Sequence, residues 1–298
     1  MARSLSRTNT LLLLAGGLSF VAVAAGAWVC AQNAVPTGLW LRNLIAWVAG
    51  GMMAVGLARL SRRGPFPVVL AATALAVAAS FLSRGQMGVH RWVSLGPLSI
   101  NAAAVTLPAA LVALAAIGRG TWWSWVLALA CLAILVAQPD GSQATAFGAA
   151  LAWIALRRNL GAAAKAAVLL STTTLVAGAW LRPDPLQPVP EVEQILQLAY
   201  RISPAIGAVA LGSLIMFALA PGLIAREGPV EASVAGEALS LYLLISALAP
   251  FIGAFPVPLV GVGLSPVLGS WLGVGLLAAL LRTNSNMSPP ASRSTLAA

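Results

Sequence analysis

Charge is scarce in this 298-residue chain, in which 8% of residues are Asp, Glu, Lys or Arg and 60% are hydrophobic. Soluble domains carry about 25% charged residues, so this composition excludes an ordinary soluble protein. Cysteine and histidine are also rare, with two and one copies respectively. Their scarcity argues against a disulfide framework and against a metal site built from Cys and His. The sequence therefore predicts an all-α, polytopic membrane protein.

Long apolar runs recur along almost the whole chain, most of them near the ~20 residues that cross a hydrocarbon core of ~30 Å. We expect about ten transmembrane helices, over residues 9–31, 42–60, 66–83, 101–118, 122–138, 143–157, 163–181, 203–225, 233–253 and 259–281. Residues 1–282 are predicted to form a single transmembrane domain, and the polar segment 283–298 a disordered cytoplasmic tail. The first run is interpreted as a retained signal anchor rather than a cleaved signal peptide.

The positions of the basic residues predict the orientation, because short cytoplasmic loops retain Lys and Arg. With the N-terminus inside, twelve of the 17 basic residues fall on the cytoplasmic side and both termini are cytoplasmic. The other five fall outside: Arg42, Arg84, Arg91, Arg182 and Arg201. The net charge of +10 thus reflects topology and attraction to anionic membrane lipids, and gives no indication of nucleic-acid binding.

The seven acidic residues are absent from the middle of every predicted span. Proton- and ion-coupled transporters place ionisable side chains near the bilayer midplane, so this absence argues against that class. The same absence does not exclude a flippase that works through a polar groove. Polar residues instead gather in three predicted outer loops, over residues 84–99, 138–143 and 182–194, which we expect to converge over one cavity.

The third loop has a helical pattern, with Pro190 suited to a first turn and Glu193, Gln197 and Arg201 spaced to line one face. We predict an amphipathic segment that continues into the next span, with a kink at Pro204. Two interpretations remain: a solvated face of an interfacial helix, or a site in which partly buried Glu193 is a general base. Similarly, Asp140 either caps the following helix or contributes to a site.

Three segments resemble the SEDS family (shape, elongation, division and sporulation proteins of the FtsW, RodA and SpoVE type). The first is similar to G-x-R-R-W-[IL]-x-L-G-P-x-x-[IL], and the chain supplies Gly88, Arg91, Trp92, Leu95, Gly96, Pro97 and Ile100. The second is similar to Q-P-D-x-G-[QT], through Gln138, Pro139, Asp140 and Gln143. The third is similar to P-V-T-G-I-P-L, through Pro258, Gly261 and Leu264.

The resemblance implies a ten-helix glycosyltransferase of the bacterial plasma membrane, which polymerises lipid II into peptidoglycan beside a class B penicillin-binding protein. The process would be division, elongation or shape control. Counting back from residues 206–208 places Glu193 at the family's catalytic aspartate. Arg91 would contact the substrate diphosphate, and cationic groups or a divalent metal ion would stabilise its departure. The implied substrate-binding residues are Arg91, Trp92, Gln138, Asp140, Gln197 and Arg201; metal ligands are unassigned.

The chain also departs from the family pattern. The family's Q-P-S-E becomes Asn101-Ala102-Ala103-Ala104, which removes an intramembrane glutamate, and a paired E-E aligns with Arg201 and Ile202. These differences keep two alternatives open. One is a catalytically inactive SEDS-like scaffold or regulator of cell-wall synthesis, and the other is a flippase for a lipid-linked precursor.

Overall fold

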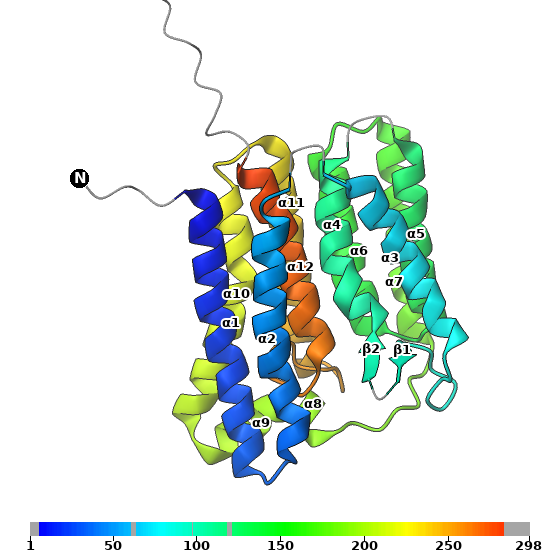
Figure 1. Cartoon of the computed structure of the whole chain (residues 1–298). Coiled ribbons are helices and arrows are strands. Elements are labelled where there is room, and N and C mark those ends of the chain that lie inside the picture. Colours follow the sequence, from blue (N-terminus) through cyan, green and yellow to red (C-terminus); the bar gives the residue numbers. More distant parts are fainter. Residues whose placement is uncertain (1–5, 61–63, 97, 118–120, 283–298) are drawn as a thin grey trace, which may run out of the picture.

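The computed structural model describes residues 6–60, 64–96, 98–117 and 121–282. Within these ranges the chain forms a bundle of ten long helices with short elements at one end (Figure 1). The long helices are α1 (Arg7–Gln32), α2 (Thr37–Leu57), α3 (Phe66–Ala79), α4 (Ala102–Ala116), α5 (Trp122–Ala137), α6 (Gly141–Arg157), α7 (Ala162–Leu181), α10 (Pro204–Ala225), α11 (Val230–Leu248) and α12 (Leu264–Leu281). The short elements are β1 (Trp92–Leu95), β2 (Leu98–Asn101), α8 (Pro190–Glu193), α9 (Ile195–Ile202) and 3-10 turns at Ser80–Leu82 and Ala249–Phe251.

Each predicted apolar run overlaps one of these long helices, but two boundaries differ clearly. Helix α2 begins at Thr37 rather than at residue 42, directly after Pro36. Helix α12 begins at Leu264 rather than at residue 259, because the preceding residues form an irregular loop in which Leu259 has a φ of 64°. The prediction of helix over 259–263 is therefore wrong.

Two groups of helices meet along the bundle. Helices α1, α2, α10 and α12 lie on one side and α3 to α7 on the other, as Figure 1 shows. Helices α11 and α12 join the groups, because both pack against α4 and α11 also packs against α6. Helices α4 and α12 approach closely: a Cβ atom at Gly269 would overlap the backbone carbonyl oxygen of Ala104. Small residues allow such close approach between membrane helices.

Helix length and composition support a multi-pass membrane protein. Six described helices, α1, α2, α7, α10, α11 and α12, are long and apolar enough to cross a bilayer. Helices α3, α4 and α5 are apolar but shorter. The full number of about ten spans and the cytoplasmic position of both termini therefore stay predictions. The predicted tail over 283–298 lies outside the described residues.

A β-hairpin before α4 is a feature that the all-α prediction did not include. Strands β1 and β2 pair antiparallel in the register Trp92↔Asn101 to Leu95↔Leu98. Gly96 lies in the turn with a φ of +60°, a conformation that glycine adopts without steric cost, whereas Pro97 lies outside the described residues. Asn101 ends the hairpin and caps α4, because its side chain accepts a hydrogen bond of 3.0 Å from the Ala104 backbone N–H.

The segment after α7 is not the continuous amphipathic helix that the sequence pattern predicts. Helix α8 ends at Glu193, α9 ends at Ile202, and Ser203 is extended, so Pro204 starts α10 instead of kinking a longer helix. The first break has a tertiary cause. The carbonyl oxygens of Glu191 and Val192 accept hydrogen bonds from Val262 and Val257, which belong to the loop before α12.

Candidate functional site

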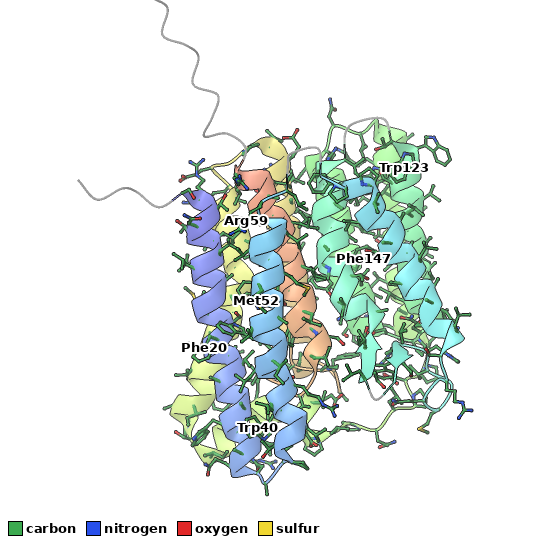
Figure 2. The ribbon with its side chains drawn as sticks, viewed as in Figure 1. Phe20, Trp40, Met52, Arg59, Trp123 and Phe147 are labelled. Atoms are coloured by element: carbon green, nitrogen blue, oxygen red, sulfur yellow. The ribbon has the colours of Figure 1, made fainter. Side chains whose placement is uncertain are left out.

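A cavity of about 340 Å³, lined by apolar, polar and charged residues, opens at the end of the bundle that carries the hairpin. We call this end the hairpin end; Figure 2 labels Trp40 near it and Arg59 toward the opposite end. Residues from all three polar loops line the cavity, as the sequence predicts, together with the start of α2, parts of α4, α11 and α12, and the loop before α12. The charged residues lining it are Arg42, Arg91, Asp140, Asp184 and Glu193.

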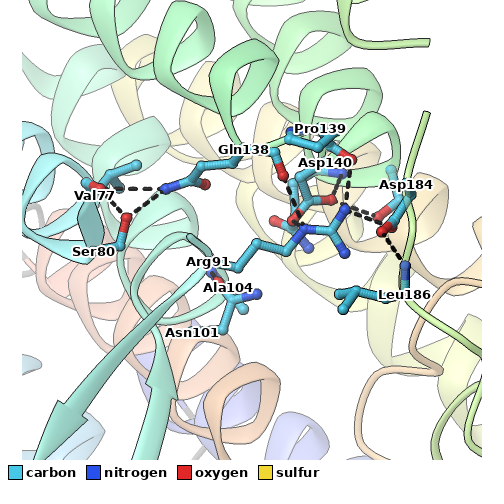
Figure 3. Close-up of polar contacts among 12 residues, drawn as sticks. Val77, Ser80, Arg91, Asn101, Ala104, Gln138, Pro139, Asp140, Asp184 and Leu186 are labelled. Carbon is cyan, nitrogen blue, oxygen red and sulfur yellow. Dashed lines mark hydrogen bonds and ion pairs between the residues drawn. The ribbon is translucent and has the colours of Figure 1, made fainter. Parts of the chain in front are cut away.

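Arg91 directly precedes β1 and lies at the centre of an ionic cluster in which Arg91 and Asp140 are buried and Asp184 is partly exposed (Figure 3). Its Nη2 donates to Asp184 Oδ2 at 2.6 Å, and its Nε lies 3.6 Å from Asp140 Oδ2. The same guanidinium donates to the carbonyl oxygens of Gln138 and Pro139. Only 8% of the Arg91 side chain is exposed. Arg91 thus joins the hairpin, the α5–α6 junction and the α7–α8 loop.

Asp140 has both roles that its position allows. Its side chain accepts a hydrogen bond of 3.2 Å from the Gln143 backbone N–H and so caps α6. It also accepts from the Ser142 hydroxyl at 3.1 Å and pairs with Arg91. A buried carboxylate needs such partners, because an unpaired charge in a site of low dielectric constant is costly.

Gln138 lies behind this cluster rather than in the cavity. Its Nε2 donates to Ser80 Oγ at 2.7 Å and to the Val77 carbonyl at 3.3 Å, as Figure 3 shows. Its backbone carbonyl oxygen accepts the Arg91 Nε–H at 3.2 Å. Gln138 is therefore a support for the α5–α6 junction, and it is not among the residues that line the cavity.

Glu193 is the last residue of α8, and it lines the cavity half-buried. Its Oε2 accepts the Val189 backbone N–H at 2.7 Å. Burial raises the pKa of its carboxyl above the ordinary value, and the nearby Glu191 charge adds to that rise. The backbone N–H groups of Val189 and Glu193, together with the Arg91 charge, lower the pKa in opposition. The net effect favours a carboxylate that exchanges protons closer to neutral pH than an ordinary Glu.

Neutral polar side chains line the cavity deeper between the helices. Tyr242 of α11 is 3% exposed, and its hydroxyl donates to Gln143 Oε1. Ser246 and Ser270, both buried, line the same region from α11 and α12. The family's intramembrane glutamate aligns with Ala104, which is 5% exposed and packs against α12. The cavity wall thus carries hydroxyl groups from α11 and α12 but no charge at residue 104.

Of the remaining predicted site residues, one lines the cavity and two do not. Trp92 lines the cavity from β1. Gln197 and Arg201 are exposed on α9 and are not among the described residues that line it. They do not share a face with Glu193, because the chain breaks at Gln194 between α8 and α9.

Sequence reasoning missed two charged residues of the cavity, Arg42 and Asp184. Asp184 lies in the irregular segment after α7, and only the folded structure brings it to Arg91. Arg42 carried a signal, because it is one of the five basic residues predicted on the outer side, where basic residues are depleted.

A divalent metal ion was one predicted way of stabilising the leaving diphosphate. Among the described residues, no group of three or more His, Cys, Asp and Glu side chains is arranged to hold a metal ion. Two of the three cavity carboxylates, Asp140 and Asp184, already contact Arg91. The donor set does not fit a metal site, and we assign no step to one.

The chain folds as a polytopic helical protein, and solved structures share this fold. The rod shape determining protein RodA of Thermus thermophilus, in an Asp-to-Ala variant, matches with a TM-score of 0.65 at 22% identity, over 89% of this chain and 95% of that one. Unaltered RodA matches with a TM-score of 0.59 at 20% identity, over 91% and 95% of the two chains. A chain from a peptidoglycan synthase complex, studied for the coordination of polymerization and crosslinking, gives 0.57 at 20% identity over 92% and 97%.

No protein-family model matches the sequence, and no curated protein matches it either. The fold is therefore established by structure. It is the SEDS-type fold of RodA, as the three sequence motifs predict, and it extends over about nine-tenths of this chain.

Proposed function

We propose that this protein is a SEDS-type glycosyltransferase of the bacterial plasma membrane, which polymerises lipid II or a related polyprenyl-linked sugar. One observation carries the proposal: Glu193, a half-buried carboxylate with a raised pKa, lines a cavity in a RodA-like fold. A general base works best when its pKa lies near the operating pH, and burial moves Glu193 in that direction.

The chemistry joins two saccharides and releases a lipid diphosphate. A hydroxyl of the acceptor attacks the anomeric carbon of the donor, the new C–O bond forms, and the bond to the diphosphate breaks. Glu193 takes the hydroxyl proton, and the diphosphate leaves with the bonding electron pair. The Glu193 carboxylate is held by the Val189 N–H at 2.7 Å through one oxygen, Oε2, which leaves Oε1 as the proton acceptor.

The ionic cluster supports this reaction by shaping the cavity. Arg91 holds three segments of the wall through Asp140, Asp184 and two backbone carbonyls. Its charge is largely satisfied by these contacts, so we assign it a positioning role. Trp92 follows it on β1 and offers an aromatic surface to a sugar ring at the cavity wall.

A second function, that of an inactive scaffold or regulator, is favoured by the alanines at the start of α4. Ala104 stands where the family has glutamate, so the cavity wall carries no carboxylate at this position. Both functions include a partner, for which we propose a class B penicillin-binding protein. One of the similar solved structures belongs to a peptidoglycan synthase complex.

The proposal is tested by purifying the protein with and without a candidate partner and measuring polymerisation of lipid II. Glu193→Gln keeps the shape but removes the base, so we expect a loss of about 10²- to 10⁴-fold in rate. Glu191→Gln is the matched control, because Glu191 lies two residues away on α8 and does not line the cavity.

Three results would contradict the assignment in different ways. Full activity of Glu193→Gln would show that another group is the base. Absence of polymerisation with every partner, with the partner still bound, would establish the scaffold. Movement of labelled lipid across vesicles without joining of sugars would identify a flippase.

A further inference from the structure

The two arginines that line the cavity have different electrostatic surroundings. Arg91 is 8% exposed in its side chain and contacts two carboxylates at 2.6 Å and 3.6 Å. Arg42, near the start of α2, is exposed and makes no hydrogen bond or ion pair with any residue in the described part of the chain. A guanidinium without an anionic partner is available to an anionic ligand.

The other charges of the cavity show why an unpaired Arg42 guanidinium is important for binding an anion. Arg91 with Asp140 and Asp184 has a formal charge of −1, and ionised Glu193 adds another negative charge to the lining. A diphosphate that enters meets net repulsion from these groups. Arg42 is the cavity-lining cation, among the described residues, whose charge is not already matched by a carboxylate.

The backbone around Arg42 is fixed to the cavity wall by its neighbour Asn43. Asn43 is 4% exposed, its Nδ2 donates to the Gly261 carbonyl at 2.7 Å, and its Oδ1 accepts the Gly263 N–H at 3.0 Å. Gly261 and Gly263 themselves line the cavity. The Arg42 backbone is therefore held in place by this clasp, while its side chain remains free to close on a ligand.

Helix α2 also offers an apolar surface that runs from Arg42 toward the opposite end of the bundle. Ile45 and Met52 are 61% and 67% exposed, and Figure 2 labels Met52 on α2 between Trp40 and Arg59. A ligand with a charged head and a long hydrocarbon chain fits this order of groups. Its head lies at the cavity, and its chain lies along α2 in the lipid.

We propose that Arg42 binds the diphosphate of the polyprenyl-linked substrate, whereas Arg91 holds the cavity walls together. The proposal rests on the function proposed above, and it replaces Arg91 by Arg42 as the diphosphate contact. A guanidinium suits this role, because its planar N–H groups bind phosphate oxygens in pairs.

The test measures binding of undecaprenyl diphosphate to the purified full chain in phosphatidylcholine nanodiscs. Arg42→Gln is expected to weaken binding by about 10- to 100-fold, the usual loss for a hydrogen-bonded charge contact. Arg42→Lys is expected to recover a large part of the loss. Arg201→Gln is the matched control, since Arg201 is also exposed at the hairpin end but does not line the cavity, and its binding should equal that of the unaltered protein.

Two further measurements keep the result unambiguous. The melting temperature of Arg42→Gln in the same nanodiscs should equal that of the unaltered protein, because the side chain makes no hydrogen bond or ion pair with the described part of the chain. Phosphatidylglycerol and inorganic diphosphate are added as competitors. If phosphatidylglycerol displaces the probe at similar concentration, Arg42 is a general site for lipid phosphate and the proposal is wrong.

The failure of this proposal differs from the failure of the proposed function. Equal binding by Arg42→Gln and the unaltered protein, with polymerisation intact, overturns the Arg42 assignment alone. An unaltered protein that neither binds undecaprenyl diphosphate nor polymerises lipid II overturns both.

Discussion

The two ends of the bundle use ion pairs in opposite ways. At the hairpin end, Arg91, Asp140 and Asp184 form a cluster in which the side chains are 8%, 5% and 27% exposed. At the other end, Arg7 and Glu227 pair at 3.3 Å with side chains that are 51% and 65% exposed. Removing one partner from a buried pair leaves an uncompensated charge, whereas exposed pairs are screened by water. The Arg91 cluster therefore fixes the cavity, whereas the Arg7–Glu227 pair contributes little.

The largest effect is expected from Arg91→Met, which leaves Asp140 and Asp184 without their cation. We expect a loss of about 3–5 kcal/mol in the free energy of unfolding, measured in detergent. The triple variant with Asp140→Asn and Asp184→Asn removes all three charges and should recover much of this loss. If the single and triple variants are equally unstable, the buried charges are not the cause.

A smaller loss of stability is expected from a substitution at the contact between α4 and α12. Gly269→Ala places a Cβ against the Ala104 carbonyl and should cost about 1–3 kcal/mol through overpacking. Gly212→Ala on α10 is the matched control, because a Cβ there meets nothing within 4 Å. Equal melting temperatures for the two variants would show that α4 and α12 accommodate the added methyl group without loss of stability.

The rate of polymerisation should depend on pH through the hairpin end. Glu193 must be ionised to accept a proton, so below its pKa the rate falls about tenfold for each pH unit. Because burial raises that pKa, the fall begins at a higher pH than for an ordinary Glu. Glu191→Gln removes a negative charge that adds to the rise in this pKa, so the acid limb should remain but move to lower pH. An acid limb at the pH of an ordinary exposed Glu would contradict the burial of Glu193.

The smallest effect is expected at the exposed end. Arg7→Gln removes the pair with Glu227 and should change the free energy of unfolding by no more than about 1 kcal/mol. The difference should shrink further in high salt. A loss as large as that of Arg91→Met would remove the distinction between the two ends.

Local patterns allowed much of the fold to be predicted, because apolar runs of membrane-crossing length determine where helices form. The cap at Asp140, the position of Glu193 in a cavity and the RodA-like fold were all accessible from sequence. Long-range contacts explain the misses. The break at Gln194 depends on hydrogen bonds from Val257 and Val262, and the partner of Arg91 in the α7–α8 loop is 93 residues away.

Long-range contacts also explain why we propose a positioning role for Arg91 instead of the diphosphate contact that the motif implies. A motif shows which residue occurs at a position, but not which carboxylates surround it after folding. Arg42 was found only when the cavity lining was known, although its place among the basic residues predicted outside was already unusual.

The clasp between Asn43 and the loop before α12 has a consequence for biosynthesis. Asn43 bonds to Gly261 and Gly263, which are 218 and 220 residues further along the chain. Membrane proteins are made from the N-terminus, so α2 is inserted long before this loop leaves the ribosome. The cavity wall is therefore complete only after the loop before α12 has been made, and α2 alone cannot form it.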